Sequence, residues 1–109
     1  MTTVPLHRLA HARAGDKGNR LNLALVAHRR EDWPHLAAQV TEERVLALFR
    51  HRGATAVRRH DLPALGAFNF VVEEVLQGGV NGALNLDGHG KSLSFLLLGM
   101  TVEAPPGAA

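Results

Sequence analysis

The residues of this sequence with the clearest capacity for chemistry lie between two stretches of alternating apolar residues. Residues 13–19 read Arg-Ala-Gly-Asp-Lys-Gly-Asn, so two glycines enclose an acid and a base, with an arginine and an asparagine outside them. Glycine accepts positive φ and lets backbone amides turn toward an anion. The candidate anion-binding residues are therefore Arg13, Gly15, Gly18 and Asn19.

Asp16 and Lys17 form the candidate catalytic pair within this segment. If catalysis occurs, Asp16 would transfer a proton, and Lys17 or Arg13 would stabilise the developing negative charge. The alternative is a hairpin-like turn, in which the glycines satisfy the backbone geometry and Asp16 bonds its own backbone. The glycine and lysine spacing of a Walker phosphate loop is absent.

Two further groups of polar residues could support such a site. Asn69 lies between two phenylalanines at the edge of an expected apolar helix stripe, where a half-buried amide needs hydrogen-bond partners. It could fix the shape of residues 16–19, or it could cap a nearby backbone group. Asp87, His89 and Lys91 belong to a glycine-rich segment, which indicates either a proton-exchanging histidine or an ordinary β-turn.

Other kinds of chemistry are disfavoured by the composition. The chain contains no cysteine and no tyrosine, so thiolate sites and disulfides are excluded and nucleophiles are scarce. His7 and His11 would lie about 13 Å apart on a strand, too far to share a metal ion. Four phenylalanines and one tryptophan, most of them in expected helices, give no platform for stacking bases. We expect no metal, no cofactor and no nucleic-acid partner.

The bulk composition indicates a globular protein. The chain has 109 residues, of which 46% are hydrophobic and 20% charged, which predicts one domain over residues 1–103 and a disordered tail over residues 104–109. No apolar stretch is long enough to cross a membrane, and the first residues do not resemble an export signal. We therefore expect a cytoplasmic protein with no membrane contact.

The charge is unevenly distributed along the chain. Residues 1–60 hold eleven Lys and Arg against five Asp and Glu, whereas residues 61–109 hold one against five. Ten of the twelve cations are arginine, which binds planar anions in a bidentate manner. The pattern is compatible with an anionic ligand or an acidic partner, but arginines that simply cover a solvated face would give the same pattern.

The elements that must position these residues follow from hydrophobic periodicity. The pattern predicts strands at 5–12 and 20–28 around a turn at 14–19, helices at 33–40 and from Thr41 to just before Gly53, a strand at 55–60, a helix at 65–77, a strand at 83–87, a turn at 88–90 and a strand at 96–102. The order β-β-α-α-β-α-β-β indicates an α+β two-layer sandwich, with helices on one face of a mostly antiparallel sheet. The apolar strand expected at 96–102 would leave an edge or face that needs cover, which favours a homo-oligomer.

The sequence also resembles a known family. GDKGN at residues 15–19, followed by Asn22 and the apolar strand to residue 27, is similar to the C-terminal ferredoxin-like domain of acyclic terpene utilisation (AtuA) proteins. The later motifs of that domain are matched by DLPALGAFNF at 61–70, GGV at 78–80, LDGHGK at 86–91 and LLGM at 97–100. The resemblance spans residues 5–103 and implies a ferredoxin-like variant of the sandwich.

What the resemblance implies about function is an accessory role. In longer AtuA-like proteins this module follows a large N-terminal domain, so a separate chain would assemble with an AtuA-like large subunit. The family's association with branched and terpenoid acids implies acyl-CoA or carboxylate chemistry, with Asn22, Asn69, His89 and Lys91 supporting the residue 13–19 segment. Two alternatives stay open: a self-sufficient small lyase or hydratase that uses Asp16 and Lys17, and an anion-binding module without chemistry.

Overall fold

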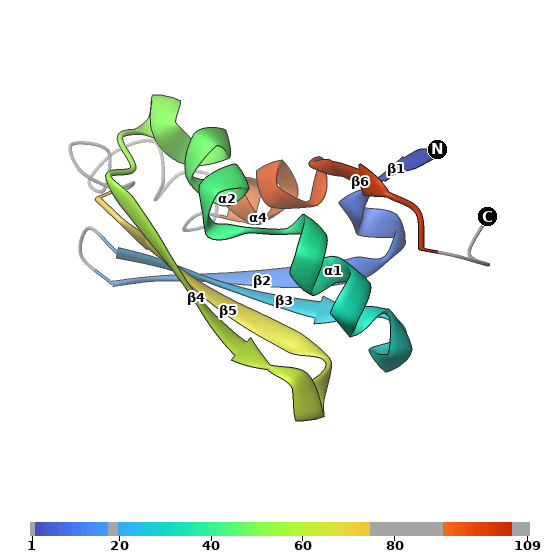
Figure 1. Cartoon of the computed structure of the whole chain (residues 1–109). Coiled ribbons are helices and arrows are strands. Elements are labelled where there is room, and N and C mark those ends of the chain that lie inside the picture. Colours follow the sequence, from blue (N-terminus) through green and yellow to red (C-terminus); the bar gives the residue numbers. More distant parts are fainter. Residues whose placement is uncertain (1, 18–19, 75–90, 106–109) are drawn as a thin grey trace.

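The structure, a computed structural model, describes residues 2–17, 20–74 and 91–105, and its main feature is an antiparallel sheet with helices on one face (Figure 1). The strands are β1 (Thr3–Pro5), β2 (Ala10–Lys17), β3 (Arg20–Ala27), β4 (Ala56–Leu62), β5 (Ala67–Glu73) and β6 (Thr101–Glu103). The helices are α1 (Trp33–Gln39), α2 (Glu42–Phe49) and α4 (Lys91–Leu98). The main sheet has the order β2-β3-β5-β4, and β1 pairs separately with β6. The expected α+β sandwich is confirmed.

The strand predicted at residues 20–28 is confirmed as β3. Leu21, Leu23 and Leu25 are fully buried, whereas the residues between them are half-buried. This alternation is the signature of a strand with one face on the core. Because β3 pairs with β2 on one side and with β5 on the other, it occupies the interior of the sheet.

The two helices predicted after β3 are confirmed as α1 and α2. Pro34 lies in the first turn of α1, where its missing amide hydrogen costs nothing. The hydroxyl oxygen of Thr41 accepts a hydrogen bond of 3.2 Å from the backbone N–H of Arg44, so Thr41 caps α2 as expected. Val45 and Phe49 are the buried residues of this helix. A 3₁₀ turn at Arg50–Arg52 follows it and ends at Gly53, whose φ is 95°.

The helix predicted at residues 65–77 is wrong, because residues 67–73 form β5. Phe68, Phe70 and Val72 are fully buried, and the residues between them are half-buried, so the relevant period is two and not 3.6. Aromatic and β-branched residues favour a strand. In addition, β5 has a partner on each side, β3 and β4, and this tertiary pairing overrides the helical spacing.

The strand predicted at residues 96–102 is also wrong over most of its length. Residues up to Leu98 belong to α4, and only Thr101–Glu103 form a strand, β6. Leucine is a strong helix former, and a run of leucines places apolar groups on both faces, so its apparent alternation carried little information. The long apolar strand that favoured self-association therefore does not exist.

The first predicted strand has different bounds in the structure. Residues 6–8 form a short 3₁₀ helix, and β2 runs from Ala10 to Lys17, through most of the turn expected at 14–19. Pairing with the regular strand β3 extends β2 past the glycine at position 15. The strand expected at 83–87 and the turn at 88–90 lie outside the described residues, as do four residues of the expected tail, 106–109.

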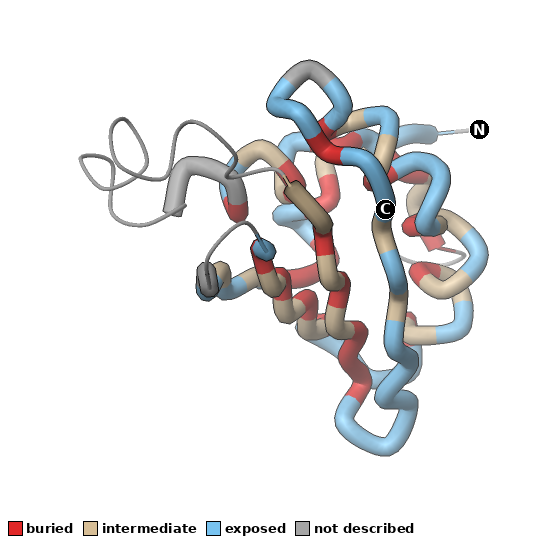
Figure 2. The backbone as a smooth tube through the Cα atoms, turned by 90° about the vertical axis from the view of Figure 1, so that its left-hand side faces the viewer, coloured by how far each residue is buried: buried red, intermediate tan, exposed pale blue. Residues whose placement is uncertain are grey.

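The core lies between the sheet and the helices. The buried side chains of β3 and β5 face those of the helices, whereas most of the opposite face of these two strands is half-buried, as the alternating colours along them show (Figure 2). The helices contribute Leu36, Val45, Phe49 and Leu97 to this core. Within the described part of the chain, no helix has the length and apolar character needed to cross a bilayer.

The outer edge of β6 is closed by side chains of α1 and α2. The backbone N–H of Glu103 donates to the Gln39 side-chain oxygen at 3.2 Å. The carbonyl oxygen of Glu103 contacts His35 Nε2, and Arg44 donates to the carbonyl oxygen of Thr101 at 2.6 Å. Such closure satisfies backbone groups that an edge strand would otherwise present to another chain.

Candidate functional site

The face of the main sheet opposite the helices carries the polar residues that the sequence singles out. Directly paired residues of neighbouring strands share a face, and every second residue of a strand belongs to it. On this face, called here the open face, the residues lie in four cross-strand rows: Arg58, Val71, Asn22 and Gly15; His60, Asn69, Ala24 and Arg13; Leu62, Ala67, Val26 and His11; Ala56, Glu73, Arg20 and Lys17. None of the described helices covers it (Figure 1).

The structure thus brings together four of the predicted site residues. Arg13 and Gly15 of β2, Asn22 of β3 and Asn69 of β5 occupy two adjacent rows of the open face. The prediction that Asn69 lies on a helix is wrong, because it belongs to β5, directly opposite Ala24. Asn69 is diagonal to Asn22 on the neighbouring strand, so both amides belong to the same face.

The free charges of the open face are positive. Arg13 and Arg58 are exposed, and neither forms a hydrogen bond or ion pair with another described residue. Arg20 instead binds Glu73 across β3 and β5, with Nε 3.1 Å from a carboxylate oxygen. Glu73 is the only acidic residue in the four rows, and its charge is engaged by Arg20.

Several other arginines of the basic half are exposed, as the solvated-face alternative expects, but they form contacts within the chain. Arg30 donates to the carbonyl oxygen of Ala64 at 3.1 Å, and Arg29 donates to the carboxylate of Glu31. The hydrogen bond with Glu31, together with the charges of Glu31 and Asp32, raises the pKa of the Arg29 guanidinium above its ordinary value. Arg13 and Arg58 differ from these residues because their guanidinium groups are uncommitted.

The two half-buried amides, Asn22 and Asn69, make no side-chain hydrogen bond to another described residue. They face outward between the strands, and each can donate and accept. Their accessible donors and acceptors are therefore available to a ligand or a partner that covers the open face.

Gly15 leaves bare backbone beside Asn22 on the open face. Its φ is not positive, which differs from the expectation that this glycine permits a left-handed turn. A Cβ atom at this position would meet no atom within 4 Å. Glycine in a strand costs stability and marks places where another backbone or a ligand approaches closely. Neither conformation nor internal packing among the described residues requires a glycine here.

The remaining predicted residues have only partial placement. Asp16 and Lys17 are the last two positions of β2, paired with Leu21 and Arg20. Lys91 is the first residue of α4. Gly18, Asn19 and His89 lie outside the described residues.

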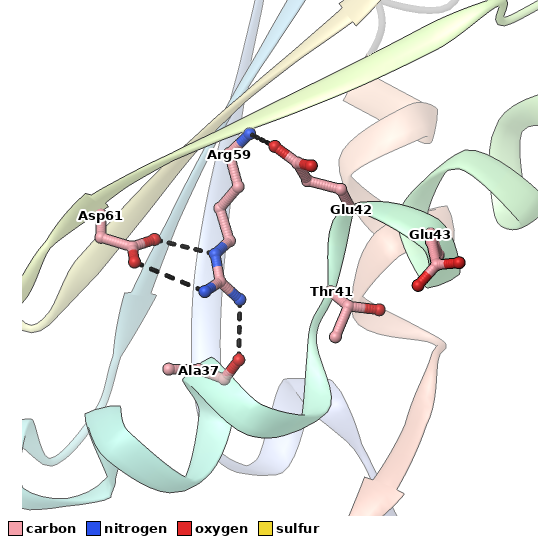
Figure 3. A pocket seen from close by; sticks show the side chains of 6 residues that line it. All are labelled: Ala37, Thr41, Glu42, Glu43, Arg59 and Asp61. Carbon is pink, nitrogen blue, oxygen red and sulfur yellow. Dashed lines mark hydrogen bonds and ion pairs between the residues drawn. The ribbon is translucent and has the colours of Figure 1, made fainter.

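A second polar region, which the sequence analysis missed, lies on the helix side of β4. A pocket of about 370 Å³ is lined by residues of α1, α2 and β4 and by the Thr41 cap (Figure 3): Ala37, Thr41, Glu42, Glu43, Arg59 and Asp61. Arg59 lies at its centre, with Nε 2.8 Å from a carboxylate oxygen of Asp61. The backbone N–H of Arg59 donates to the Glu42 carboxylate at 2.8 Å and closes that part of the β4 edge.

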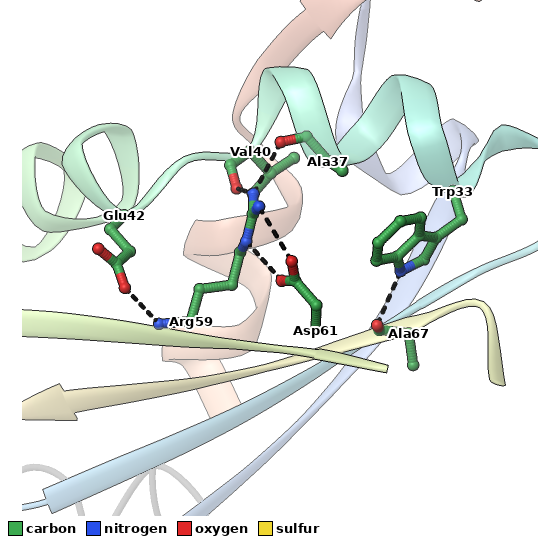
Figure 4. Close-up of polar contacts among 7 residues, drawn as sticks. All are labelled: Trp33, Ala37, Val40, Glu42, Arg59, Asp61 and Ala67. Carbon is green, nitrogen blue, oxygen red and sulfur yellow. Dashed lines mark hydrogen bonds and ion pairs between the residues drawn. The ribbon is translucent and has the colours of Figure 1, made fainter. Parts of the chain in front are cut away.

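The guanidinium of Arg59 serves the fold, because it donates four hydrogen bonds within the chain. Its Nη1 donates to the carbonyl oxygens of Ala37 at 2.7 Å and Val40 at 2.9 Å, at the end of α1 (Figure 4). It also lies 5.2 Å above the centre of the Phe68 ring, at a distance typical of a cation–π contact. No fork of donors remains to bind an anion, so the pocket does not replace the open face as a candidate anion site.

Trp33 ties the start of α1 to the same part of the sheet. Its indole Nε1–H donates to the carbonyl oxygen of Ala67 at 2.8 Å, and its ring stacks on Phe68 with 5.0 Å between centres (Figure 4). All three aromatic rings attached to this region, Trp33, Phe68 and Phe70, therefore belong to the helix side of the sheet. The four rows of the open face contain none of them.

The described residues include no group of three or more His, Asp or Glu side chains arranged to hold a metal ion.

Arg58 and His60 also belong to the candidate site, although neither was among the predicted site residues. The signal that identifies them is the period of two shared by β4 and β5, since the pairs Arg58–Val71 and His60–Asn69 place both residues on the open face. Assigning residues 67–73 to a helix hid that relation.

Comparison with known families gives one finding. The family model for the AtuA ferredoxin-like domain matches residues 4–103, which is most of the chain. Comparison with curated proteins and with solved structures gives no match.

Proposed function

Because the chain belongs to the AtuA ferredoxin-like domain family, we propose that it is a partner subunit of an AtuA-like large chain, acting in acyl-CoA or carboxylic acid breakdown. In this proposal the β2–β3 end of the open face, with Arg13, Gly15 and Lys17 on β2 and residues 18–19 after it, binds the anionic group. The observation that carries the proposal is the convergence of uncommitted Arg13 with Asn22 and Asn69 on one face of the sheet.

The chemistry of the face supports anion binding more than catalysis by this chain alone. A guanidinium and two amides offer N–H donors to a carboxylate or a phosphate without a proton transfer. Neither an arginine nor an asparagine side chain transfers a proton near neutral pH. The small lyase or hydratase is therefore the weaker candidate. If no large chain binds, the proposal is reduced to an anion-binding module without chemistry.

The assembly is tested by mixing the chain with an AtuA-like large chain from the same organism at micromolar concentration. Size-exclusion chromatography with light scattering should show one complex that contains both chains. Two separate peaks at the masses of the free proteins would contradict the partner role.

The anion site is tested by thermal unfolding with coenzyme A, with a branched carboxylic acid and with inorganic phosphate. A ligand that binds only the native state raises the unfolding temperature. Stabilisation by the carboxylic acid alone would indicate carboxylate recognition, and stabilisation by coenzyme A and phosphate would indicate phosphate recognition. Arg13→Ala should reduce the shift, whereas Arg52→Ala, at an exposed position after α2, should leave it unchanged. No shift with any of the three compounds, with or without the large chain, would contradict anion binding.

A further inference from the structure

The open face has an apolar and amide centre between two basic borders. The central strands β3 and β5 contribute small or amide side chains, Asn22, Ala24, Val26, Asn69 and Val71, all of them half-buried. The outer strands contribute exposed cations and histidines, His11 and Arg13 from β2 and Arg58 and His60 from β4. An apolar centre with a polar border is the usual anatomy of a protein–protein interface.

The dimensions of this face suit a macromolecule. Four strands spaced at about 4.8 Å span roughly 14 Å from β2 to β4, and the four rows extend about 20 Å along the strands. Arg13 and Arg58 stand on opposite borders of this area, in neighbouring rows. One small anion cannot contact both borders and the centre at once, whereas a protein surface can.

The charges of the open face indicate what kind of protein surface it binds. Arg13 and Arg58 are uncommitted, and the only acid of the four rows, Glu73, is paired with Arg20. A second copy placed face to face would bring arginines against arginines, which opposes association. A single-stranded nucleic acid bound on a sheet face usually stacks its bases on aromatic rings, and the four rows contain none. A surface that carries carboxylates around a small apolar patch is complementary to both borders and to the centre.

Gly15 adds an independent argument for close contact. It is a strand residue of the open face that neither its φ nor any atom within 4 Å requires to be glycine. A docked protein explains it, because a glycine lets another backbone reach the strand and the adjacent Asn22 amide.

Resting on the proposed partner role, we infer that the open face is the docking surface for the AtuA-like large chain. Carboxylates of that chain bind Arg13 and Arg58, and its backbone or small side chains cover Gly15, Asn22 and Asn69. The same arginine and amides then bind the large chain in the complex and a small anion in the free chain.

The test measures the affinity of the complex by isothermal titration calorimetry for Arg13→Glu, Arg58→Glu and the double variant. Each single reversal should weaken binding about tenfold or more, because it replaces an attraction by a repulsion at the interface. Arg52→Glu makes the same charge change at an exposed position outside the sheet and should change affinity less than twofold. Circular dichroism confirms folding, which the exposed positions of Arg13 and Arg58 do not endanger.

The outcomes separate the two proposals. If the wild-type chain does not bind the large chain, the partner role fails, and the docking surface fails with it. If the wild type binds and the double variant binds equally well, only the docking surface is wrong. Loss of a homodimer on Arg13→Glu, or tight binding of a single-stranded RNA to the same face, would also overturn the inference, whereas a loss of affinity confined to the two open-face variants supports it.

Discussion

Arg58 and Arg59 are neighbours in the sequence, yet they have opposite environments, because successive residues of a strand belong to opposite faces. Arg58 extends from the open face without a partner among the described residues. Arg59 points to the helix side, where Asp61, two helix carbonyl oxygens and the Phe68 ring surround it. The same residue type is therefore available for recognition at one position and committed to stability at the next.

Replacing Arg59 by alanine should lower the free energy of unfolding by about 2–4 kcal/mol, since several charge-assisted hydrogen bonds and the packing on Phe68 are lost together. Urea unfolding followed by tryptophan fluorescence measures the change. Arg58→Ala is the matched control, and its effect should stay within about 0.5 kcal/mol. Equal effects of the two substitutions would show that Arg59 does not join α1 to β4 as described.

Gly15→Ala should leave the stability unchanged or raise the free energy of unfolding by up to about 1 kcal/mol, because alanine has less backbone entropy to lose than glycine. Nothing within 4 Å opposes the added Cβ. Gly66→Ala is the contrasting variant, since Gly66 has φ 64° and its Cβ would lie 3.1 Å from Arg30 Cγ. That substitution should be destabilising in the same urea titration. A large loss of stability in Gly15→Ala would mean that the fold, and not a partner, requires the glycine.

At the residue scale, the sequence allowed Arg13, Gly15, Asn22 and Asn69 to be chosen from their types and motif. The structure places these residues on one face, and their role stays a prediction. The pairing of Arg59 with Asp61 and with the carbonyl oxygens of α1 could not, because it depends on how a helix and a strand far apart in sequence meet.

At the scale of elements, local sequence signals predicted helices and strands correctly, whereas runs that fit two hydrophobic periods were assigned wrongly. β3, α1 and α2 could be predicted because regular alternation, a first-turn proline and the Thr41 cap are local properties. β5 and α4 could not, since phenylalanine-valine and leucine runs fit both a period of two and one of 3.6. Their assignment is decided by tertiary contacts: β5 lies between β3 and β4, whereas α4 packs with the other helices on the sheet.

Thr41→Ala should lower the free energy of unfolding by about 1 kcal/mol, because the first turn of α2 loses the oxygen that accepts the Arg44 N–H. Thr41→Ser keeps that oxygen and should restore most of the stability. The measurement is again urea unfolding. If serine and alanine behaved alike, the threonine would act through its methyl group and not as a cap.

Gln39→Ala should release the outer edge of β6, because the Glu103 N–H loses its acceptor. Hydrogen exchange of the Glu103 amide should become faster, while the amides of the main sheet keep their protection. Gln39→Glu retains an acceptor oxygen at this position and is the control. Unchanged exchange at Glu103 in the alanine variant would contradict the role of α1 in closing this edge.

At the scale of the whole molecule, the sheet separates two kinds of surface. One face is covered by helices, where ion pairs and capped edges hold the fold together, and the other carries uncommitted cations around an apolar centre. The charge asymmetry of the sequence was compatible with an anionic partner and also with a solvated basic face. Its spatial form, with basic borders on β2 and β4, follows only from the strand order β2-β3-β5-β4.

The most direct test of this division follows side-chain nuclear magnetic resonance signals of the isotope-labelled chain during titration with the AtuA-like large chain. Backbone signals cannot distinguish the two faces of a strand, whereas side-chain signals can. The account predicts that the amide groups of Asn22 and Asn69 and the Nε–H signals of Arg13 and Arg58 shift or broaden early in the titration. The Trp33 indole and Arg59 signals, on the helix side, should change less than these. Early changes confined to Trp33 and Arg59, with the open-face signals unaffected, would contradict the account.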